Sequence, residues 1–392
     1  MKLLVLTHVR HYTKGGRLHA YGPYAREIDL WAGMFDRVTI AAPLASWAPP
    51  GDCARLQAGN LSVEAMPELN TTTLPGLLRT LAALPWVVLR LAAAMAAADA
   101  VHIRCPGNYG LLGAVLAPIF CRRRYAKYAG QWNFTDAKWT VRLERRILRS
   151  NWWKGPVTVY GEWPGEPPHI IPFFTSMLSA PQLERGRAAW LRRNFAPGPL
   201  HAIYTGRLSK AKNVDAILRA IAAARARGIA VRCTVVGDGP ELGSLRRLAA
   251  GLEINPLVQF TGGVSYDRVL DGLAAADVLV LISETEGWPK SIAEGMAFGL
   301  VCIGSDQGLT PRMLSEGRGI ILPPGDPDRL ADALCELALD PERRRAIAAA
   351  AIAWSSRYSI EGLAESLKEL LERWWKVKLN AGELTLTKEA AG

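Results

Sequence analysis

Strand and helix patterns alternate along this chain from end to end, and this alternation restricts the fold more than any other feature. Short apolar runs are separated by longer segments of helical composition. Strands that alternate with helices form parallel sheets covered by helices on both faces. The expected strands are 2–7, 37–41, 61–65, 100–103, 124–129 and 156–160 in the first half, and 201–205, 231–236, 257–260, 277–282, 301–304 and 319–322 in the second. The sequence therefore predicts an α/β protein.

Two domains are expected, because 392 residues exceed what one hydrophobic core usually holds. A proline-rich passage from 163 to 199 marks the join between the halves. Each half has the alternation of strands and helices that is typical of a Rossmann-like, doubly wound parallel sheet. In such sheets ligands bind at the carboxyl ends of the strands. The predicted divisions are an N-terminal domain (1–175), a linker (176–199), a C-terminal domain (200–360), a further helix (361–376) and a flexible tail (377–392).

The segment 283–299 carries the clearest functional signal. It follows the apolar run 278–282, which is typical of a buried parallel strand, and it leads into a segment of helical composition. A strand, a glycine-bearing turn and a helix start together present free N–H groups to an anion. Glu286 and Glu294 flank this anion site, eight positions apart. Carboxylates beside a phosphate site suit neutral hydroxyls, which predicts a ligand with sugars on both sides of a phosphate.

This arrangement resembles the Glu-x7-Glu motif of the retaining glycosyltransferases of family 4, also called group 1 glycosyltransferases. Other segments resemble the same family in the same order: 203–213, which contains Arg207 and Lys212, then 235–240, 260–264 and 323–327. The resemblance implies a GT-B architecture, in which two Rossmann-like domains face each other across a cleft, with an acceptor-binding N-terminal domain and a nucleotide-sugar-binding C-terminal domain. It also implies that the helix 361–376 crosses back to the N-terminal domain.

The resemblance implies roles for particular residues. The first glutamate would meet the donor sugar and the second the nucleoside ribose, while the arginine and lysine bind the diphosphate. The catalytic candidates are Arg207, Lys212 and Glu286. The donor-binding candidates are Gly15, Gly16, Gly206, Gly237, Gly262, Val264, Gly287, Trp288, Lys290, Ser291 and Glu294. Electrostatic stabilisation of the leaving diphosphate needs no bound metal, so no metal site and no cofactor are predicted.

Structural interpretations remain open for several of these residues. Ser291 and Glu294 have the spacing of a capping box, in which Glu294 would only satisfy a backbone N–H at a helix start. Gly15 and Gly16 fit a phosphate-binding loop and a plain flexible loop equally well. Arg207 could serve as a salt-bridge partner, and the order of the motifs is what favours the ligand site.

A basic segment suggests where the protein works. Between 122 and 154 there are ten lysines or arginines and two acidic residues. Four arginines recur at helical spacing, and tryptophans flank them, which suits an anionic membrane surface. This candidate surface consists of Arg142, Arg145, Arg146, Arg149, Trp152 and Trp153. A solvated basic face is the equal alternative, and nucleic acid is not expected because no recognition motif accompanies the segment.

Two further features bear on location. The apolar stretch 77–98 is interrupted by Arg79, Pro85 and Arg90, which favours a crossover helix over a membrane span, with a helix in the membrane interface as the second choice. The six cysteines lack paired spacing, which indicates reduced thiols. The predicted location is the cytoplasm, with peripheral attachment to the inner face of the cytoplasmic membrane as a refinement.

These observations predict a retaining glycosyltransferase that moves a sugar from a nucleoside diphosphate sugar to a glycan or a lipid-linked acceptor in cell-surface polysaccharide biosynthesis. One alternative is a sugar-nucleotide epimerase on the same fold, for which no acid and base groups can be placed. The other is a non-catalytic basic membrane-binding protein, which would bind no sugar nucleotide.

Overall fold

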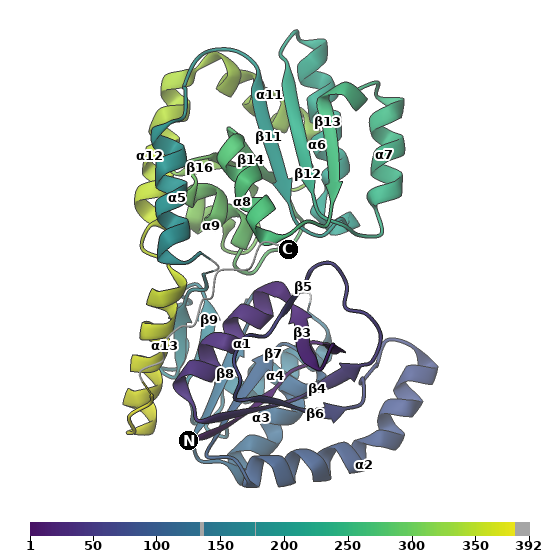
Figure 1. The fold of residues 1–392 in the computed structure, drawn as a ribbon, viewed down its shortest axis with the longest axis vertical. Coiled ribbons are helices and arrows are strands. Elements are labelled where there is room, and N and C mark those ends of the chain that lie inside the picture. Colours follow the sequence, from purple (N-terminus) through teal and green to yellow (C-terminus); the bar gives the residue numbers. More distant parts are fainter. Residues whose placement is uncertain (134–136, 177, 381–392) are drawn as a thin grey trace. The chain divides into compact units, whose positions relative to one another are not determined.

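A computed structural model describes residues 1–133, 137–176 and 178–380. The chain divides into two compact units. Unit 1 comprises Met1–Phe174 with Leu363–Gly392, and unit 2 comprises Thr175–Gly362. Each unit is an α/β structure built around one main sheet, as the alternation of patterns predicted (Figure 1).

The sheet of unit 1 has a parallel central part with the strand order β10-β9-β8-β7-β1-β4, and β6 also pairs with β4. All six strands expected in this half are present. The structure adds the hairpin β2–β3 and the short strands β5 and β10. The strands are β1 (Lys2–Leu6), β2 (His11–Lys14), β3 (Arg17–Tyr21), β4 (Arg37–Ala45), β5 (Cys53–Arg55), β6 (Leu61–Met66), β7 (Ala100–Cys105), β8 (Arg124–Tyr128), β9 (Val157–Tyr160) and β10 (Ile170–Phe173).

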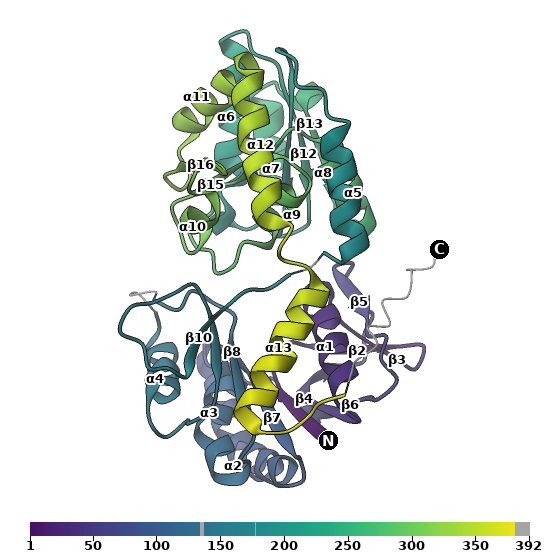
Figure 2. The same cartoon turned by 90° about the vertical axis from the view of Figure 1, so that its left-hand side faces the viewer.

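Helices connect these strands and cover the sheet. They are α1 (Gly22–Met34), α2 (Leu74–Ala96), α3 (Asn108–Phe120) and α4 (Trp139–Arg149). The crossover helix expected before the strand at 100 is α2. The last helix, α13 (Ile360–Trp375), runs alongside α1, where the ring of Trp375 meets that of Phe35 edge-on at 6.3 Å (Figure 2).

Unit 2 contains a six-stranded, fully parallel sheet in the order β13-β12-β11-β14-β15-β16. Its strands are β11 (Leu200–Thr205), β12 (Val231–Val236), β13 (Val258–Gly262), β14 (Val278–Leu281), β15 (Val301–Ser305) and β16 (Gly319–Leu322). Its helices are α5 (Ala180–Leu191), η1 (Lys210–Lys212), α6 (Val214–Ala226), α7 (Leu242–Gly251), η2 (Asn255–Leu257), α8 (Tyr266–Ala275), α9 (Lys290–Ala297), α10 (Thr310–Leu314), α11 (Pro327–Leu339) and α12 (Pro341–Ser355).

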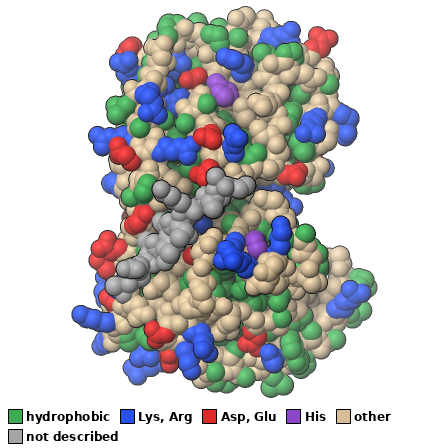
Figure 3. All heavy atoms as spheres, viewed as in Figure 1, with side chains coloured by type: hydrophobic (Ala, Val, Ile, Leu, Met, Phe, Trp, Pro, Cys, Tyr) green, Lys and Arg blue, Asp and Glu red, His purple; other side chains and the backbone are tan. Residues whose placement is uncertain are grey.

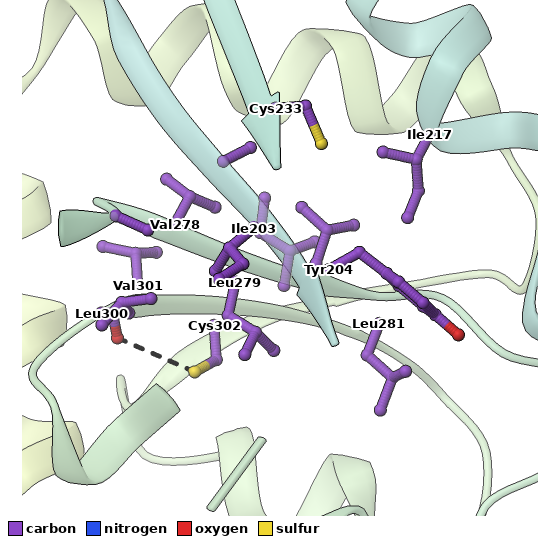
Figure 4. Packing of buried hydrophobic residues seen from close by; sticks show 14 of the residues in the cluster. Ile203, Tyr204, Ile217, Cys233, Val278, Leu279, Leu281, Leu300, Val301 and Cys302 are labelled. Carbon is purple, nitrogen blue, oxygen red and sulfur yellow. Dashed lines mark hydrogen bonds between the residues drawn. The ribbon is translucent and has the colours of Figure 1, made fainter. Parts of the chain in front are cut away.

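The core of unit 2 explains why the sequences of its central strands are continuous apolar runs. Strands β14 and β15 are buried along their whole length, because helices cover both faces of the sheet. Figure 4 shows side chains of β11, β14 and β15 meeting those of α6 between the layers; Ile203, Ile217 and Leu279 are among them, and all three are fully buried. This packing fixes the carboxyl ends of the strands at one edge of the sheet.

The predicted linker 176–199 was wrong in its central part. Residues Ala180–Leu191 form α5, which packs in unit 2, and a Cβ added at Gly186 would lie 2.4 Å from the carbonyl oxygen of Ala297. The helix begins with a capping box between Ser179 and Gln182. Of the prolines in the passage, only Pro181 belongs to this helix, and it lies in the first turn, where a proline does not interrupt the helical hydrogen bonds.

The predicted flexible tail 377–392 lies largely outside the described residues, which end at 380. The part that is described packs on unit 1. Leu379 is buried, and Asn380 donates a hydrogen bond from Nδ2 to the carboxylate of Asp36 at 2.9 Å. The first four residues of the predicted tail are therefore ordered by contacts with unit 1.

Candidate donor site and comparisons

The loop between β14 and α9 lies at the carboxyl edge of the sheet of unit 2 and is held by two neighbouring loops. The N–H of Glu284 donates to the carbonyl of Ala211 at 2.9 Å, and the N–H of Leu309 donates to the carbonyl of Gly287 at 3.3 Å. Asn213 has a left-handed backbone, and its Nδ2 donates to the carbonyl of Ile282 at 3.0 Å. The loop after β14 is the segment with the clearest functional signal in the sequence. These bonds hold it in place beside the segment that contains Lys212.

Lys212 and Glu286 form an ion pair in this site. The Nζ of Lys212 lies 2.5 Å from Oε1 of Glu286, and the two side chains are 26% and 10% exposed. The residues are far apart in the sequence but belong to the ends of adjacent loops. A cation beside a carboxylate can receive an anionic group and a hydroxyl of one ligand side by side, which is the arrangement that the predicted donor site requires.

Arg207 lies at the end of β11 with an exposed side chain. Its carbonyl oxygen accepts a hydrogen bond from the hydroxyl of Tyr204 at 2.9 Å. Burial, together with the nearby carboxylate of Glu286, raises the pKa of Tyr204 above its usual range. Tyr204 therefore stays protonated and fixes the backbone from which Arg207 projects.

Glu294 lies in α9 and is 7% exposed. One of its carboxylate oxygens accepts a hydrogen bond from the hydroxyl of Tyr266 at 2.8 Å. The capping-box alternative was wrong: α9 begins at Lys290 after Pro289, and Ser291 is the second residue of the helix. Tyr266 was missed in the sequence, since a partner that lies 28 positions away leaves no local signal.

The donor-binding candidates at the strand ends come together. The N–H of Gly237 donates to the carbonyl of Gly262 at 2.9 Å, and a Cβ added at Gly237 would lie 1.9 Å from the carbonyl oxygen of Gly206. A side chain at 237 would thus collide with the backbone of the next loop. Val264 follows in the loop after β13 and is half-buried.

The remaining candidates of unit 2 surround the amino end of α9. Gly287 is in the loop, and Lys290 and Ser291 form the first turn, whose N–H groups have no acceptors within the helix. The ring of Trp288 stacks on that of Trp354 at 6.4 Å and meets Tyr358 edge-on at 5.5 Å. Trp288 therefore anchors the loop to the helical layer.

Gly15 and Gly16 are placed elsewhere, in unit 1. They are the two turn residues of the β2–β3 hairpin, with φ of +58° and +71°. Two successive positive φ values are what a two-residue hairpin turn requires, and glycine adopts them without strain. This geometry explains both glycines without a ligand.

Unit 1 contains a buried group of charges that the sequence analysis missed. Oε1 of Glu27 lies 2.7 Å from Nη1 of Arg104 and 2.9 Å from Nζ of Lys127, and all three side chains are at most 12% exposed. The guanidinium of Arg104 also lies over the ring of Tyr24 at 4.9 Å. Two cations against one carboxylate leave a net positive charge near the carboxyl ends of β7 and β8.

The predicted membrane surface on α4 was wrong as a continuous face. Arg145 is buried and donates to the carbonyl of Trp132, and Arg149 pairs with Glu166. Trp153 is fully buried. The residues of this set that remain exposed are Arg142, Arg146 and Trp152. Helical spacing placed the arginines on one side of α4, but part of that side packs against the rest of unit 1.

Comparisons with known proteins agree with this geometry. The structure of Anabaena HepE in complex with UDP and glucose has a TM-score of 0.70 to this chain at 17% identity and covers 95% of this chain and 99% of that one. With the two parallel-sheet α/β units, this likeness confirms the GT-B fold.

Residues 191–354 match the model of the family "Glycosyl transferases group 1". The GDP-mannose-dependent alpha-(1-6)-phosphatidylinositol monomannoside mannosyltransferase of Mycobacterium tuberculosis is 30% identical over 47% of this chain and 50% of its own length. The alpha-D-kanosaminyltransferase of Streptomyces kanamyceticus is 26% identical over 68% of this chain and 75% of its own length.

The predicted resemblance to group 1 glycosyltransferases is therefore confirmed, and the matched region contains the whole candidate donor site of unit 2. The chain spans about half the length of the first of these curated relatives.

Proposed function

We propose that this protein is a retaining glycosyltransferase of family 4, which transfers a sugar from a nucleoside diphosphate sugar to a glycan or lipid-linked acceptor during cell-surface polysaccharide biosynthesis. The family match over 191–354 and the GT-B fold support this proposal. The curated relatives are named for different donors and acceptors, and HepE was solved with UDP and with glucose. The proposal therefore names the class of donor and leaves its base and sugar open.

The observation that carries the proposal is the position of two carboxylates on either side of the start of α9, one in the preceding loop and one within the helix. Glu286 is paired with Lys212, and Glu294 accepts from Tyr266. In this proposal Glu286 receives hydroxyls of the donor sugar, and Glu294, held in place by Tyr266, receives those of the ribose. The first turn of α9 lies between them and faces the diphosphate.

The chemistry follows from the charges in the site. As the bond between the sugar and the diphosphate breaks, negative charge grows on the departing phosphate oxygen, and Arg207 and Lys212 stabilise it. The acceptor hydroxyl attacks the anomeric carbon from the same face, and its proton passes to the departing phosphate oxygen. Every group in this scheme belongs to the chain or to the two substrates, so the proposed reaction uses no cofactor.

We also propose that the protein works in the cytoplasm, as a peripheral protein on the inner face of the cytoplasmic membrane. A lipid-linked acceptor would be presented at that surface.

The buried charges of unit 1 bear on the chemistry of the acceptor. Arg104 and Lys127 together exceed the single carboxylate of Glu27 by one positive charge, which supports an acceptor that carries a negative group.

The test begins with calorimetric titration of nucleoside diphosphate sugars that differ in base and sugar. With the donor that binds, Lys212→Ala should lower donor turnover about 10²–10³-fold, as expected when one donor to a growing oxyanion is removed. Lys210→Ala is the matched control, because Lys210 is an exposed lysine of the same short helix. Its turnover should stay close to that of the wild type.

A second measurement addresses the ribose. Glu294→Gln should weaken nucleoside diphosphate binding, while Glu284→Gln, an exposed neighbour at the start of the loop, should not. Wild-type turnover in Lys212→Ala together with wild-type affinity in Glu294→Gln would exclude this edge of the sheet as the donor site.

A further inference from the structure

Helix α2 leaves an unusually large share of its apolar side chains exposed. Leu74, Leu78, Leu81 and Leu89 are 54–71% exposed, and Trp86 is 48% exposed. The four leucines recur at i, i+4, i+7 and i+15, which places them on one face of the helix. This face points away from the core of unit 1.

The opposite stripe of α2 holds the helix on unit 1. It consists of Thr80, Val87, Leu91 and Met95, and the last three are fully buried. They belong to the core cluster that also contains residues of β7 and α3. The helix thus has two apolar faces, of which the core covers one.

Neighbouring residues extend the exposed face. Val115, Ile119 and Phe120 of α3, which packs against α2, are each at least 40% exposed. Trp152 is 49% exposed, and its Nε1 donates to the carbonyl of Val115 at 3.2 Å. Figure 3 shows hydrophobic side chains gathered at the lower right, over α2. Contiguous apolar surface of this kind marks an interaction site on soluble proteins.

The helices that carry this surface bring only positive charges to it. The sequences of α2 and α3 contain no acidic residue. Arg79 and Arg90 are eleven positions apart and so share one edge of α2, where Arg90 lies over the ring of Trp86 at 5.5 Å and pairs with Glu64. Arg122 and Arg123 follow the end of α3. An apolar face bordered by arginines and tryptophans fits the interface of an anionic bilayer.

The same observations argue for a helix that lies flat in the membrane surface. Of the helices in the described part of the chain, α2 alone is long and apolar enough to cross a membrane. A spanning orientation would remove Val87, Leu91 and Met95 from the core and place two arginines in the hydrocarbon. Docking through the outer face keeps the core intact.

We propose that the exposed faces of α2 and of the end of α3, with Trp152, form the surface that docks this protein on an anionic lipid bilayer. The inference builds on the proposed function, since it names the surface by which the enzyme reaches a lipid-linked acceptor. Exposed leucines enter the headgroup region and the arginines meet anionic headgroups, each contributing about 1 kcal/mol near the surface.

The test uses the full chain and sucrose-loaded vesicles, made either of equal parts phosphatidylglycerol and phosphatidylcholine or of phosphatidylcholine alone. The wild type should sediment with the anionic vesicles and less with the neutral ones. The variant Leu78→Glu/Leu81→Glu/Leu89→Glu should lower the partition coefficient at least tenfold, because three apolar side chains would have to enter the interface charged.

Two controls make the result specific. Leu191→Glu/Leu339→Glu changes equally exposed leucines of unit 2, which are 67% and 68% exposed, and should bind vesicles as the wild type does. Arg142→Glu/Arg146→Glu changes the exposed arginines of α4 and should lower binding less than threefold. If the glutamate triple variant does not fold, Leu78→Ser/Leu81→Ser/Leu89→Ser replaces it.

Equal partition of the wild type and the triple variant would overturn the proposal. The proposal would also fail if the wild type does not bind vesicles but forms a dimer, and the triple variant is a monomer. A second copy of the chain would then cover the surface. Nucleoside diphosphate binding is measured on every variant and should not change. A wild type that docks on vesicles but binds no sugar nucleotide would refute the proposed function and leave the docking surface standing.

Discussion

Glu144 illustrates how strongly a single residue of this protein depends on its surroundings. It lies on α4 and is 1% exposed, and a Cβ added at Gly110 of α3 would lie 2.4 Å from its Oε1. Burial raises the pKa of this carboxyl from 4.5 to about 7, although the thiol of Cys105 and the N–H of Gly107 partly offset the effect. The packing of α3 on α4 therefore holds a carboxyl that ionises near neutral pH.

The sign of the resulting pH dependence follows from this shift. The folded form binds its proton more tightly than the unfolded chain, so this group's stabilisation is complete below pH 4.5 and is lost as the pH rises through about 7. Glu144→Gln should therefore be more stable than the wild type at pH 8, by up to about 3 kcal/mol, and equally stable at pH 4. Urea unfolding at both pH values measures the difference.

The exposed carboxylate of Asp52 provides the control for that experiment, because Asp52→Asn removes a charge from unit 1 without relieving burial. Its stability should follow that of the wild type at both pH values. A Glu144→Gln protein that gains nothing at pH 8 would show that the carboxyl is solvated in solution.

Among the elements, α4 shows how an arginine-rich helix can be structural. Nη1 of Arg145 donates to the carbonyl of Trp132, and the guanidinium of Arg149 lies over the Trp132 ring at 4.6 Å. Glu166 accepts from Nε of Arg149 at 2.9 Å and from Nε1 of Trp132 at 2.8 Å. These contacts tie the loop before α4 and the loop after β9 to the helix.

Arg145→Ala should accordingly cost about 2 kcal/mol of the free energy of unfolding, in the range for hydrogen bonds made by charged groups. Arg142→Ala, in the same helix but exposed, should change it by less than about 0.5 kcal/mol. Both values come from denaturant unfolding of the full chain. Equal effects of the two substitutions would mean that Arg145 is not held in the interior.

For the whole molecule, the important feature is that unit 1 is made of two separate stretches of the chain. Residues from Leu363 onward belong to it, although unit 2 lies between them and Phe174 in the sequence. Trp375, near the end of α13, is 9% exposed, and its Nε1 donates to the carbonyl of Arg124 at 3.3 Å. The end of the described chain therefore completes the packing of unit 1.

Trp375→Ala should lower the stability of unit 1 by about 3–5 kcal/mol, as for other large buried aromatic side chains. Calorimetry with and without nucleoside diphosphate separates the units, because the ligand raises only the transition of the unit that binds it. The transition assigned to unit 2 should not move. Trp374→Ala is the control, since that ring is only half-buried, and an equal loss in both variants would contradict the role of Trp375.

Local patterns in the sequence were sufficient for the two parallel sheets and for the meeting of the two loops that form the candidate donor site. Apolar runs such as 278–282 must be buried wherever they lie, and the carboxyl ends of parallel strands share one edge, so Lys212 and Glu286 meet there. The same reasoning could not find the β2–β3 hairpin, whose strands are short and only partly buried.

The tertiary structure decided how individual side chains are used. A periodic pattern gives the face on which a residue lies, but which faces are covered depends on segments far away in the chain. For this reason the sequence did not show that Arg145 is buried or that the leucines of α2 are exposed. Nor did it show that Glu294 accepts a hydrogen bond from Tyr266 and does not cap its helix. Burial is a property of the assembled layers, and no single segment contains it.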